Sequence, residues 1–304
     1  MRILVTGANG LLGQKLLDKL LNRKGVTVLG VSASANRNPH LPQESFAQAD
    51  ITDMPHFAAI AQRFHPTHIV HAAAMTSVER CEQQQERCLE VNVVATEKIA
   101  TFCQEQQIHL TFLSTDFVFD GIAGPYREND APRPCNNYGI SKQEAEKRIL
   151  ASGAQAAILR TILVYGVIAD KGRSNIVLWV KDNLSRGDSI SVVCDQWRMP
   201  TWVDDLADAC IRSMERQATG IYHISSDTMF SILEIAEQVA CYWNLDKTLI
   251  RPVTARELGQ DQNRPRTTGF YLEKAKTDLG FYPTPLVESF NIIEKQLLIF
   301  QSHE

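Results

Sequence analysis

The sequence predicts an α/β protein built on a doubly wound parallel sheet, with a smaller mixed α/β lobe beside it. Short apolar runs of strand length alternate with segments of helical spacing through the first half of the chain, and the first run leads directly into a glycine-rich turn. Strands that are apolar on both faces are typical of a parallel sheet covered by helices on both sides. The strand-length runs are residues 2–6, 26–31, 68–71, 110–114 and 156–160.

The glycine-rich turn follows the first run and opens the first predicted helix. Its glycines allow the backbone to turn tightly and to approach a pyrophosphate, which then meets the free N–H groups at the positive end of the helix. Strand, turn and helix occur in the order that a Rossmann dinucleotide site requires. We therefore predict that a dinucleotide contacts Gly7, Asn9, Gly10, Leu11, Leu12 and Gly13.

The end of the second strand predicts which dinucleotide binds. An acidic residue there would hold the ribose 2′-hydroxyl of NAD, whereas a basic residue nearby would accommodate the 2′-phosphate of NADP. The strand ends at Ser32, Arg37 follows, and no carboxylate is present to repel a phosphate. The sequence thus favours NADP(H) over NAD(H), with a solvated loop arginine as the alternative. Asp50 and Ile51 are expected beside the adenine, unless Asp50 only starts a helix.

Tyr138 and Lys142 are four residues apart and therefore share one face of a predicted helix. An adjacent ammonium lowers the pKa of a phenol, which is about 10 when unperturbed. This spacing alone is common, but an earlier apolar strand ends in Ser114 and Thr115, and such hydroxyls face the crevice where parallel sheets bind ligands. We predict that Thr115 hydrogen-bonds a substrate oxygen while Tyr138 exchanges its proton, and that Lys142 also contacts the nicotinamide ribose.

The alternation of strands and helices loosens beyond residue 165, where proline-bearing segments interrupt the helical stretches. We predict a dinucleotide-binding domain over residues 1–165, completed by about 193–225, and a smaller substrate-binding lobe formed by 166–192 and 226–304. The helical stretches in this half are 175–186, 203–216, 233–243 and 286–300. The last of them would serve the core or the contact of a homodimer.

Composition narrows the class of protein. With 304 residues, 44% hydrophobic and 22% charged, the chain is long enough for one large or two modest cores. A formal net charge of -4 leaves no basic surface for nucleic acid, and no segment reads as a membrane span or a signal peptide. Seven scattered cysteines and eight histidines form neither a disulfide frame nor a metal-ligand pattern. We expect a cytoplasmic protein without a metal, a membrane or a nucleic-acid partner.

With these residues in hand, the sequence resembles the extended short-chain dehydrogenase/reductase superfamily, and within it the dTDP-4-dehydrorhamnose reductases. The resemblance rests on ordered strings along nearly the whole chain, chiefly residues 6–13, 71–74, 114–121, 138–142 and 195–201. It implies NADPH-dependent reduction of the C4 ketone of a dTDP-linked 4-keto-6-deoxy sugar, with Thr115, Tyr138 and Lys142 as the catalytic trio. It also places Ala72, Ala73 and Ala74 at the cofactor. The residues expected to contact the nucleotide sugar are Thr76, Ser114, Asp116, Phe117, Val118, Gln196, Arg198 and Arg264.

Two departures from the reductase pattern concern the sugar pocket. Leu163 stands where the rhamnose-forming enzymes carry a tryptophan, and Arg198 stands where a glycine is expected before Met199 and Pro200. Arg198 would either pair with a diphosphate or narrow the pocket. Residues 195–201 and 264–266 also resemble the regulatory β subunit of methionine adenosyltransferase, which shares the fold and the dinucleotide site. Two alternatives therefore stay open, a nucleotide-sugar epimerase or dehydratase and a non-catalytic dinucleotide-binding regulatory subunit.

Overall fold

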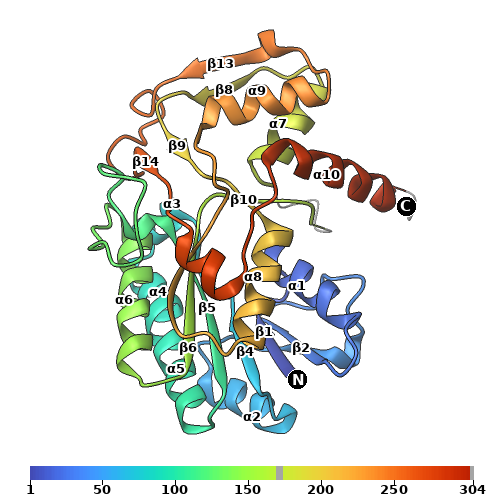
Figure 1. Ribbon diagram of the computed structural model, residues 1–304, viewed down its shortest axis with the longest axis vertical. Coiled ribbons are helices and arrows are strands. Elements are labelled where there is room, and N and C mark those ends of the chain that lie inside the picture. The colour runs from blue at the N-terminus through green and yellow to red at the C-terminus, as the bar shows by residue number, and fades with distance from the viewer. Residues whose placement is uncertain (169–173, 302–304) are drawn as a thin grey trace.

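The computed structural model describes residues 1–168 and 174–301 and contains a seven-stranded sheet in which every neighbouring pair is parallel (Figure 1). This architecture confirms the predicted doubly wound sheet. β1 (Arg2–Thr6), which lies between β4 (His68–His71) and β2 (Thr27–Ser32), sends Ile3 and Val5 into one hydrophobic core and Leu4 into the other, since side chains alternate along a strand. The strand order is β11 (Gly220–Ile224), β6 (Ala156–Thr161), β5 (His109–Thr115), β4, β1, β2 and β3 (Phe46–Gln48).

Helices cover both faces of the sheet (Figure 1). α1 (Leu11–Leu21) and α8 (Val203–Glu215) share the first core with Ile3 and Val5. On the opposite face, the second core contains apolar side chains of α2 (Met54–Phe64), α5 (Ala95–Glu105) and α6 (Asn137–Ala151). Shorter helical segments are η1 (Gln43–Ser45), α3 (Val78–Gln83), α4 (Gln85–Leu89), η2 (Glu90–Val94), η3 (Asp116–Val118), η4 (Lys247–Leu249) and η5 (Ala275–Leu279).

A third hydrophobic core lies in the upper part of Figure 1. β8 (Ile190–Val193) pairs in parallel with β13 (Ile250–Val253), and α7 (Ile176–Ser185), α9 (Ile232–Tyr242) and α10 (Leu286–Gln301) pack around this pair. Short strands lie between this layer and the main sheet. They are β7 (Val164–Tyr165) beside β10 (Thr201–Trp202), and β9 (Trp197–Arg198) between β12 (Phe230–Ser231) and β14 (Thr267–Thr268).

The chain passes between the two parts more than once. It leaves the main sheet after β6, returns through α8 to β11, and departs again into α9. Leu272, Ala275 and Leu279 then pack into the core of the main sheet, although they fall within the predicted smaller lobe. The predicted domain boundaries stay a prediction.

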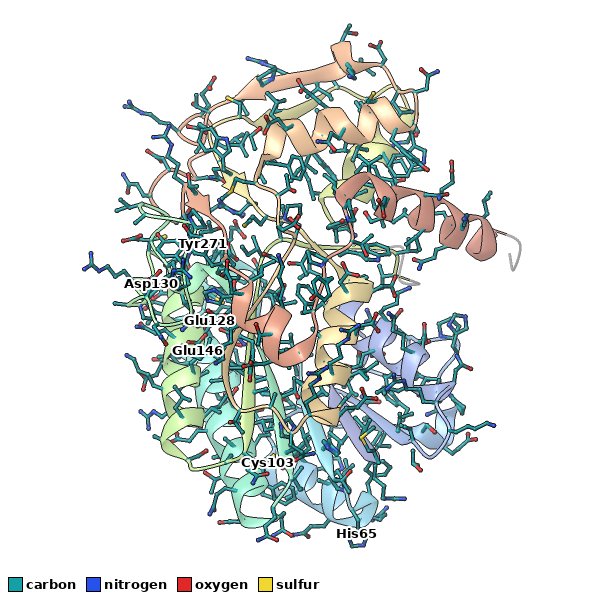
Figure 2. The ribbon with its side chains drawn as sticks, in the orientation of Figure 1. His65, Cys103, Glu128, Asp130, Glu146 and Tyr271 are labelled. Atoms are coloured by element: carbon teal, nitrogen blue, oxygen red, sulfur yellow. The ribbon has the colours of Figure 1, made fainter. Side chains whose placement is uncertain are left out.

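His65, at the end of α2, lies at the far end of the molecule from this smaller layer (Figure 2).

Charged side chains form hydrogen bonds with the backbone at the outer edge of β11. The carbonyl of Ile221 accepts a hydrogen bond from Lys274 Nζ (2.7 Å), and the N–H of His223 donates to Glu128 Oε1 (3.2 Å). Ile221 and His223 lie two residues apart on the strand, so their backbone groups point to the same side, away from β6.

Across residues 1–168 and 174–301, no helix has both the length and the apolar character needed to cross a membrane.

Candidate functional site

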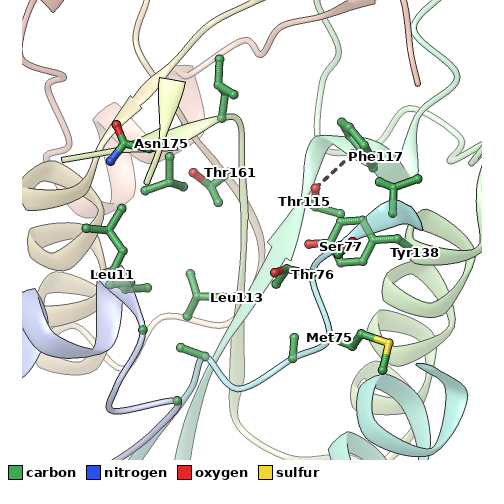
Figure 3. Close-up of a pocket in the computed structure, with 18 of the residues that line it drawn as sticks. Leu11, Met75, Thr76, Ser77, Leu113, Thr115, Phe117, Tyr138, Thr161 and Asn175 are labelled. Atoms are coloured by element: carbon green, nitrogen blue, oxygen red, sulfur yellow. Dashed lines mark hydrogen bonds between the residues drawn. The ribbon is translucent and has the colours of Figure 1, made fainter. Parts of the chain in front are cut away.

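A cavity of about 1240 Å³ lies where the carboxyl ends of β1, β4 and β5 meet the smaller layer (Figure 3). Parallel α/β sheets bind their ligands at this edge. All but two of the predicted site residues line it. They are Gly7, Asn9, Gly10, Leu11, Leu12, Gly13, Ser32, Asp50, Ile51, Ala72, Ala73, Ala74, Thr76, Ser114, Thr115, Asp116, Phe117, Tyr138, Lys142, Gln196, Arg198 and Arg264.

The two exceptions are Val118 and Arg37. Val118 is completely buried in the core of the main sheet, because the tight turn of η3 directs it inward, so it is a core residue and not a substrate contact. The side chain of Arg37 is exposed and lies outside the cavity lining, while its backbone N–H donates to Asn9 Oδ1 at 2.9 Å. A contact between Arg37 and a 2′-phosphate stays a prediction.

The glycine-rich turn has the shape that a pyrophosphate requires. Gly7 has φ +72°, and a Cβ there would lie 2.8 Å from the backbone of Ala72. A Cβ on Gly13 would lie 2.2 Å from the carbonyl oxygen of Gly7. Gly10 caps α1 without any side-chain hydrogen bond to the first amides of the helix. These amides therefore face the cavity as donors for an anion.

Asp50 lines the cavity and does not cap a helix, and its contact with an adenine stays a prediction. Asp53 caps α2, whereas Asp50 accepts hydrogen bonds from Thr52 and forms an ion pair with Arg87 at 2.9 Å. Burial alone would raise the pKa of Asp50, but Thr52 and Arg87 lower it below its usual value. Arg87 also lines the cavity, and no motif in the sequence pointed to it.

Thr115 and Tyr138 face the same part of the cavity, next to Thr76 and Ser77 (Figure 3). Thr115 ends β5, and its hydroxyl accepts from the N–H of Phe117 and donates to Asp116 Oδ1, both at 3.2 Å. Tyr138 lies in the first turn of α6, with its ring edge-on to Phe117 at a centroid distance of 6.0 Å. Two hydroxyl groups from distant segments of the chain therefore lie at one wall of the cavity.

Burial dominates the protonation of Tyr138 and Lys142. It raises the pKa of the Tyr138 phenol above its usual value, and the Thr115 hydroxyl opposes this shift. The expected lowering by the ammonium is therefore not observed. Desolvation lowers the pKa of Lys142 to about 7, although the charge of Glu146 raises it. The ammonium lies over the ring of Phe112, 3.9 Å from its centroid.

Lys142→Met is expected to make the protein more resistant to unfolding near neutral pH. The pKa of Lys142 falls from 10.5 to about 7 on folding, so between these values the unfolded chain binds more protons and the stability of the wild type rises with pH. Each pH unit in this window contributes about 1.4 kcal/mol at most. The advantage of the variant should be largest below pH 7 and shrink as the pH rises.

Urea unfolding at about pH 6 and about pH 9 measures this effect. Lys147→Met, on the exposed side of the same helix, is the matched control and should show no such pH dependence. A gain that is equal at both pH values would mean that Lys142 is not a buried, titrating amine.

A buried ion pair supports the wall that carries these residues. Arg160 of β6 donates to Glu146 of α6 through Nε (2.9 Å) and Nη2 (2.7 Å), and both side chains are at most 4% exposed. The hydroxyl of Ser114 donates to the same carboxylate at 2.5 Å. Arg160 Nη1 also reaches the carbonyl of Glu128. Glu128 and Glu146 lie on the same side of the molecule (Figure 2). Ser114 is therefore held from behind the cavity.

Two nitrogen donors at the cavity have no protein partner among the described residues, Gln196 Nε2 and Arg264 Nε. The residue Gln196 is only 4% exposed, and Arg264 is held by Glu79 through Nη2 at 2.5 Å. Buried donors usually find an acceptor, so both fit a ligand that carries oxygen acceptors. Leu163 also lines the cavity, in the left-handed region at φ 40°, at the position where a tryptophan was expected.

Two relatives match most of this chain. A dTDP-4-keto-6-deoxy-D-glucose reductase from Streptomyces niveus is 30% identical over 96% of this chain and 97% of its own length. A methionine adenosyltransferase 2 subunit beta from Xenopus laevis is 34% identical over 85% of this chain and 77% of its own length.

Among solved structures, the dTDP-4-dehydrorhamnose reductase of Bacillus anthracis in complex with NADP superposes with a TM-score of 0.86. It is 27% identical, and the match covers 97% of this chain and 99% of that one. The family model described as the RmlD substrate binding domain matches residues 1–297. The chain therefore belongs to the RmlD substrate-binding-domain family.

Proposed function

We propose that the protein is an NADPH-dependent reductase that acts on the C4 ketone of a dTDP-linked 4-keto-6-deoxy sugar. The observation that supports this proposal is that Thr115, Tyr138 and Lys142 line the same cavity as the glycine-rich turn. The names of the Streptomyces and Bacillus relatives support the same reaction. The seven free cysteines fit our further proposal of a cytoplasmic location.

NADP(H) is the cofactor that we propose. The turn of Gly7 to Gly13 and the start of α1, which has no side-chain cap, fit its pyrophosphate, and Ser32 lines the cavity where an NAD-specific site would place an acid. The Bacillus relative was crystallised with NADP. Bound NADPH would supply the hydride that reduces the ketone.

The protein's own residues would position the sugar and move its proton. The Thr115 hydroxyl accepts from the N–H of Phe117 and donates to Asp116 Oδ1, and on substrate binding it would turn its hydrogen from Asp116 to the C4 oxygen. Tyr138, with a raised pKa, holds its proton at neutral pH and would donate it to the alkoxide that forms at C4. Gln196 Nε2 and Arg264 Nε would find acceptors on the sugar or its diphosphate.

The test is NADPH consumption, followed by its absorbance, with dTDP-4-keto-6-deoxy sugars as substrates. Oxidation of NADPH that depends on the sugar, with a 4-hydroxy sugar as the product, is the expected result. A sugar converted without net NADPH consumption would replace the reductase with an epimerase or dehydratase. Tight NADPH binding without turnover on any such sugar would refute an enzymatic role on this substrate class.

A regulatory subunit is the second candidate, because the Xenopus relative is a methionine adenosyltransferase subunit and Arg198 and Leu163 depart from the reductase pattern. Under that hypothesis the protein would bind NADPH and a methionine adenosyltransferase catalytic chain. Size-exclusion chromatography of the purified pair measures this. Co-elution together with absent turnover would favour regulation, whereas separate elution with turnover would exclude it.

Gly13→Ala is expected to weaken NADPH binding by at least about tenfold. The added Cβ would meet the carbonyl oxygen of Gly7 at 2.2 Å, so the turn must move away from the position that cradles the pyrophosphate. Fluorescence titration of NADPH measures the change. Gly25→Ala, whose Cβ meets nothing within 4 Å, should leave the affinity unchanged. Equal affinity in both variants would place the dinucleotide elsewhere.

A further inference from the structure

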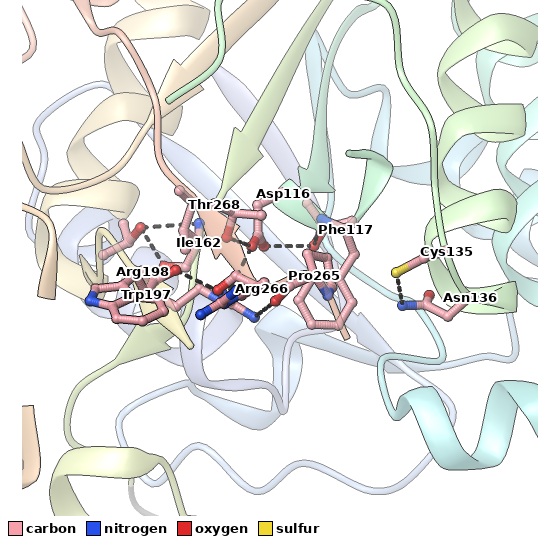
Figure 4. A network of polar contacts seen from close by, with 12 residues as sticks. Asp116, Phe117, Cys135, Asn136, Ile162, Trp197, Arg198, Pro265, Arg266 and Thr268 are labelled. Carbon is pink, nitrogen blue, oxygen red and sulfur yellow. Dashed lines mark hydrogen bonds and ion pairs between the residues drawn. The ribbon is translucent and has the colours of Figure 1, made fainter. Parts of the chain in front are cut away.

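Arg198 is the residue whose role the sequence left open between binding a diphosphate and narrowing the pocket. Its side chain is 4% exposed, and its terminal nitrogens donate to three backbone carbonyls (Figure 4). Nη1 reaches Trp197 (2.7 Å) and Arg266 (3.1 Å), and Nη2 reaches Pro265 (2.6 Å). The terminal nitrogens of the guanidinium therefore donate their hydrogen bonds to the protein backbone rather than to a ligand.

The remaining nitrogen of Arg198 faces Asp116. Nε lies 3.8 Å from Oδ2 of this carboxylate, which is 4% exposed, and the other oxygen accepts the hydroxyl of Thr115 at 3.2 Å. Thr268 of β14 donates to Oδ2. Burial raises the pKa of Asp116 above its ordinary value, and Arg198 and the two threonines offset only part of this rise. Arg198 thus stabilises the charge on the group that orients Thr115.

The carbonyls held by Arg198 belong to a segment that borders the catalytic end of the cavity. This segment, residues 263–268, has further attachments to the main sheet domain. Asn136, which caps the start of α6, donates to the carbonyl of Asn263 at 2.8 Å, and Arg264 pairs with Glu79 of α3. Arg198 and Thr268 both join this segment to the end of β5 through Asp116.

We propose that Arg198 is a positioning residue, which fixes Asp116, and through it the Thr115 hydroxyl, while it ties residues 265–266 to the catalytic wall. A planar guanidinium suits this role because its nitrogens reach several oxygens in one plane. A lysine would keep the charge beside Asp116 but lose most of the carbonyl contacts. The kinetic consequence rests on the proposed reductase function, whereas the structural consequence does not.

The kinetic test compares Arg198→Lys, Arg198→Met, Asp116→Asn and the double variant Arg198→Met/Asp116→Asn. We expect Arg198→Met and Asp116→Asn each to lower kcat by at least about tenfold with KM changed by less than about threefold. The Lys variant should recover part of the loss, and the double variant should be no worse than the worse single variant. Arg251→Met, an exposed arginine of β13, is the control and should keep wild-type kinetics.

Amide hydrogen exchange of residues 263–268 tests the tether without any turnover. Exchange should accelerate by at least about tenfold in Arg198→Met, less in Arg198→Lys, and not in Arg251→Met. Unchanged exchange, or a larger rise in KM than fall in kcat, would overturn the proposal, because Arg198 would then be dispensable for the segment or would bind substrate directly. If the wild type lacks turnover while exchange accelerates as expected, the reductase function fails and the tether stands.

Discussion

Tyr138→Phe is expected to lower kcat by about 10²- to 10⁴-fold, the range in which a positioned general acid contributes. The substitution removes only the phenol oxygen. The ring keeps its edge contact with Phe117, and the helix that carries it keeps its Asn136 cap, so the fold and the cavity should remain intact. What is lost is the proton donor beside Thr115, whose hydroxyl is already turned toward Asp116.

Two measurements separate this loss from unfolding or loss of the cofactor. The variant should bind NADPH with wild-type affinity and should unfold at a similar urea concentration. Tyr282→Phe, which removes an exposed phenol, should keep full turnover. If Tyr138→Phe keeps more than about a tenth of the wild-type kcat, another group donates the proton and the assigned role of Tyr138 is wrong.

Arg160→Met is expected to destabilise the protein by about 3–5 kcal/mol, which is the usual cost of removing one partner of a buried ion pair. Methionine preserves much of the volume, but Glu146 would keep a carboxylate with only the Ser114 hydroxyl as partner. Since Ser114 and Thr115 are adjacent on β5, the disturbance should also reach the catalytic wall. Urea unfolding measures the change in free energy.

The double variant Arg160→Met/Glu146→Leu is the informative companion, because it removes both charges and should recover a large part of the lost stability. Arg148→Met provides a matched control on α6, the helix that carries Glu146, since the ion pairs of Arg148 with Glu97 and Glu144 are exposed. That control should change stability far less. Equal effects of Arg160→Met and Arg148→Met would contradict the importance of burial.

The strands of the main sheet could be predicted because they are buried on both faces and follow one another at regular intervals. The runs at 2–6 and 68–71 coincide with β1 and β4, and 110–114 falls within β5. The candidate site was predictable for the same reason. The topology brings the carboxyl ends of these strands together, so residues directly after them meet at one cavity.

Other features depend on contacts that no local pattern contains. Val118 follows Asp116 and Phe117 closely, yet the geometry of η3 turns it into the core. Arg198 could be recognised as unusual, but its carbonyl partners come from residues 265 and 266, far along the chain. The β8–β13 pair was missed because its strands are short and separated by the whole of α8 and α9.

The charged side chains on the edge of β11 affect how copies of this protein can meet. An edge strand with open backbone groups is a template on which another chain can add a strand and so begin aggregation. Here Glu128 and Lys274 occupy an N–H and a carbonyl of that edge, and an incoming strand would have to displace both. Continuous sheets across two copies are thereby disfavoured at this edge, so a second copy would have to bind at another surface of the protein.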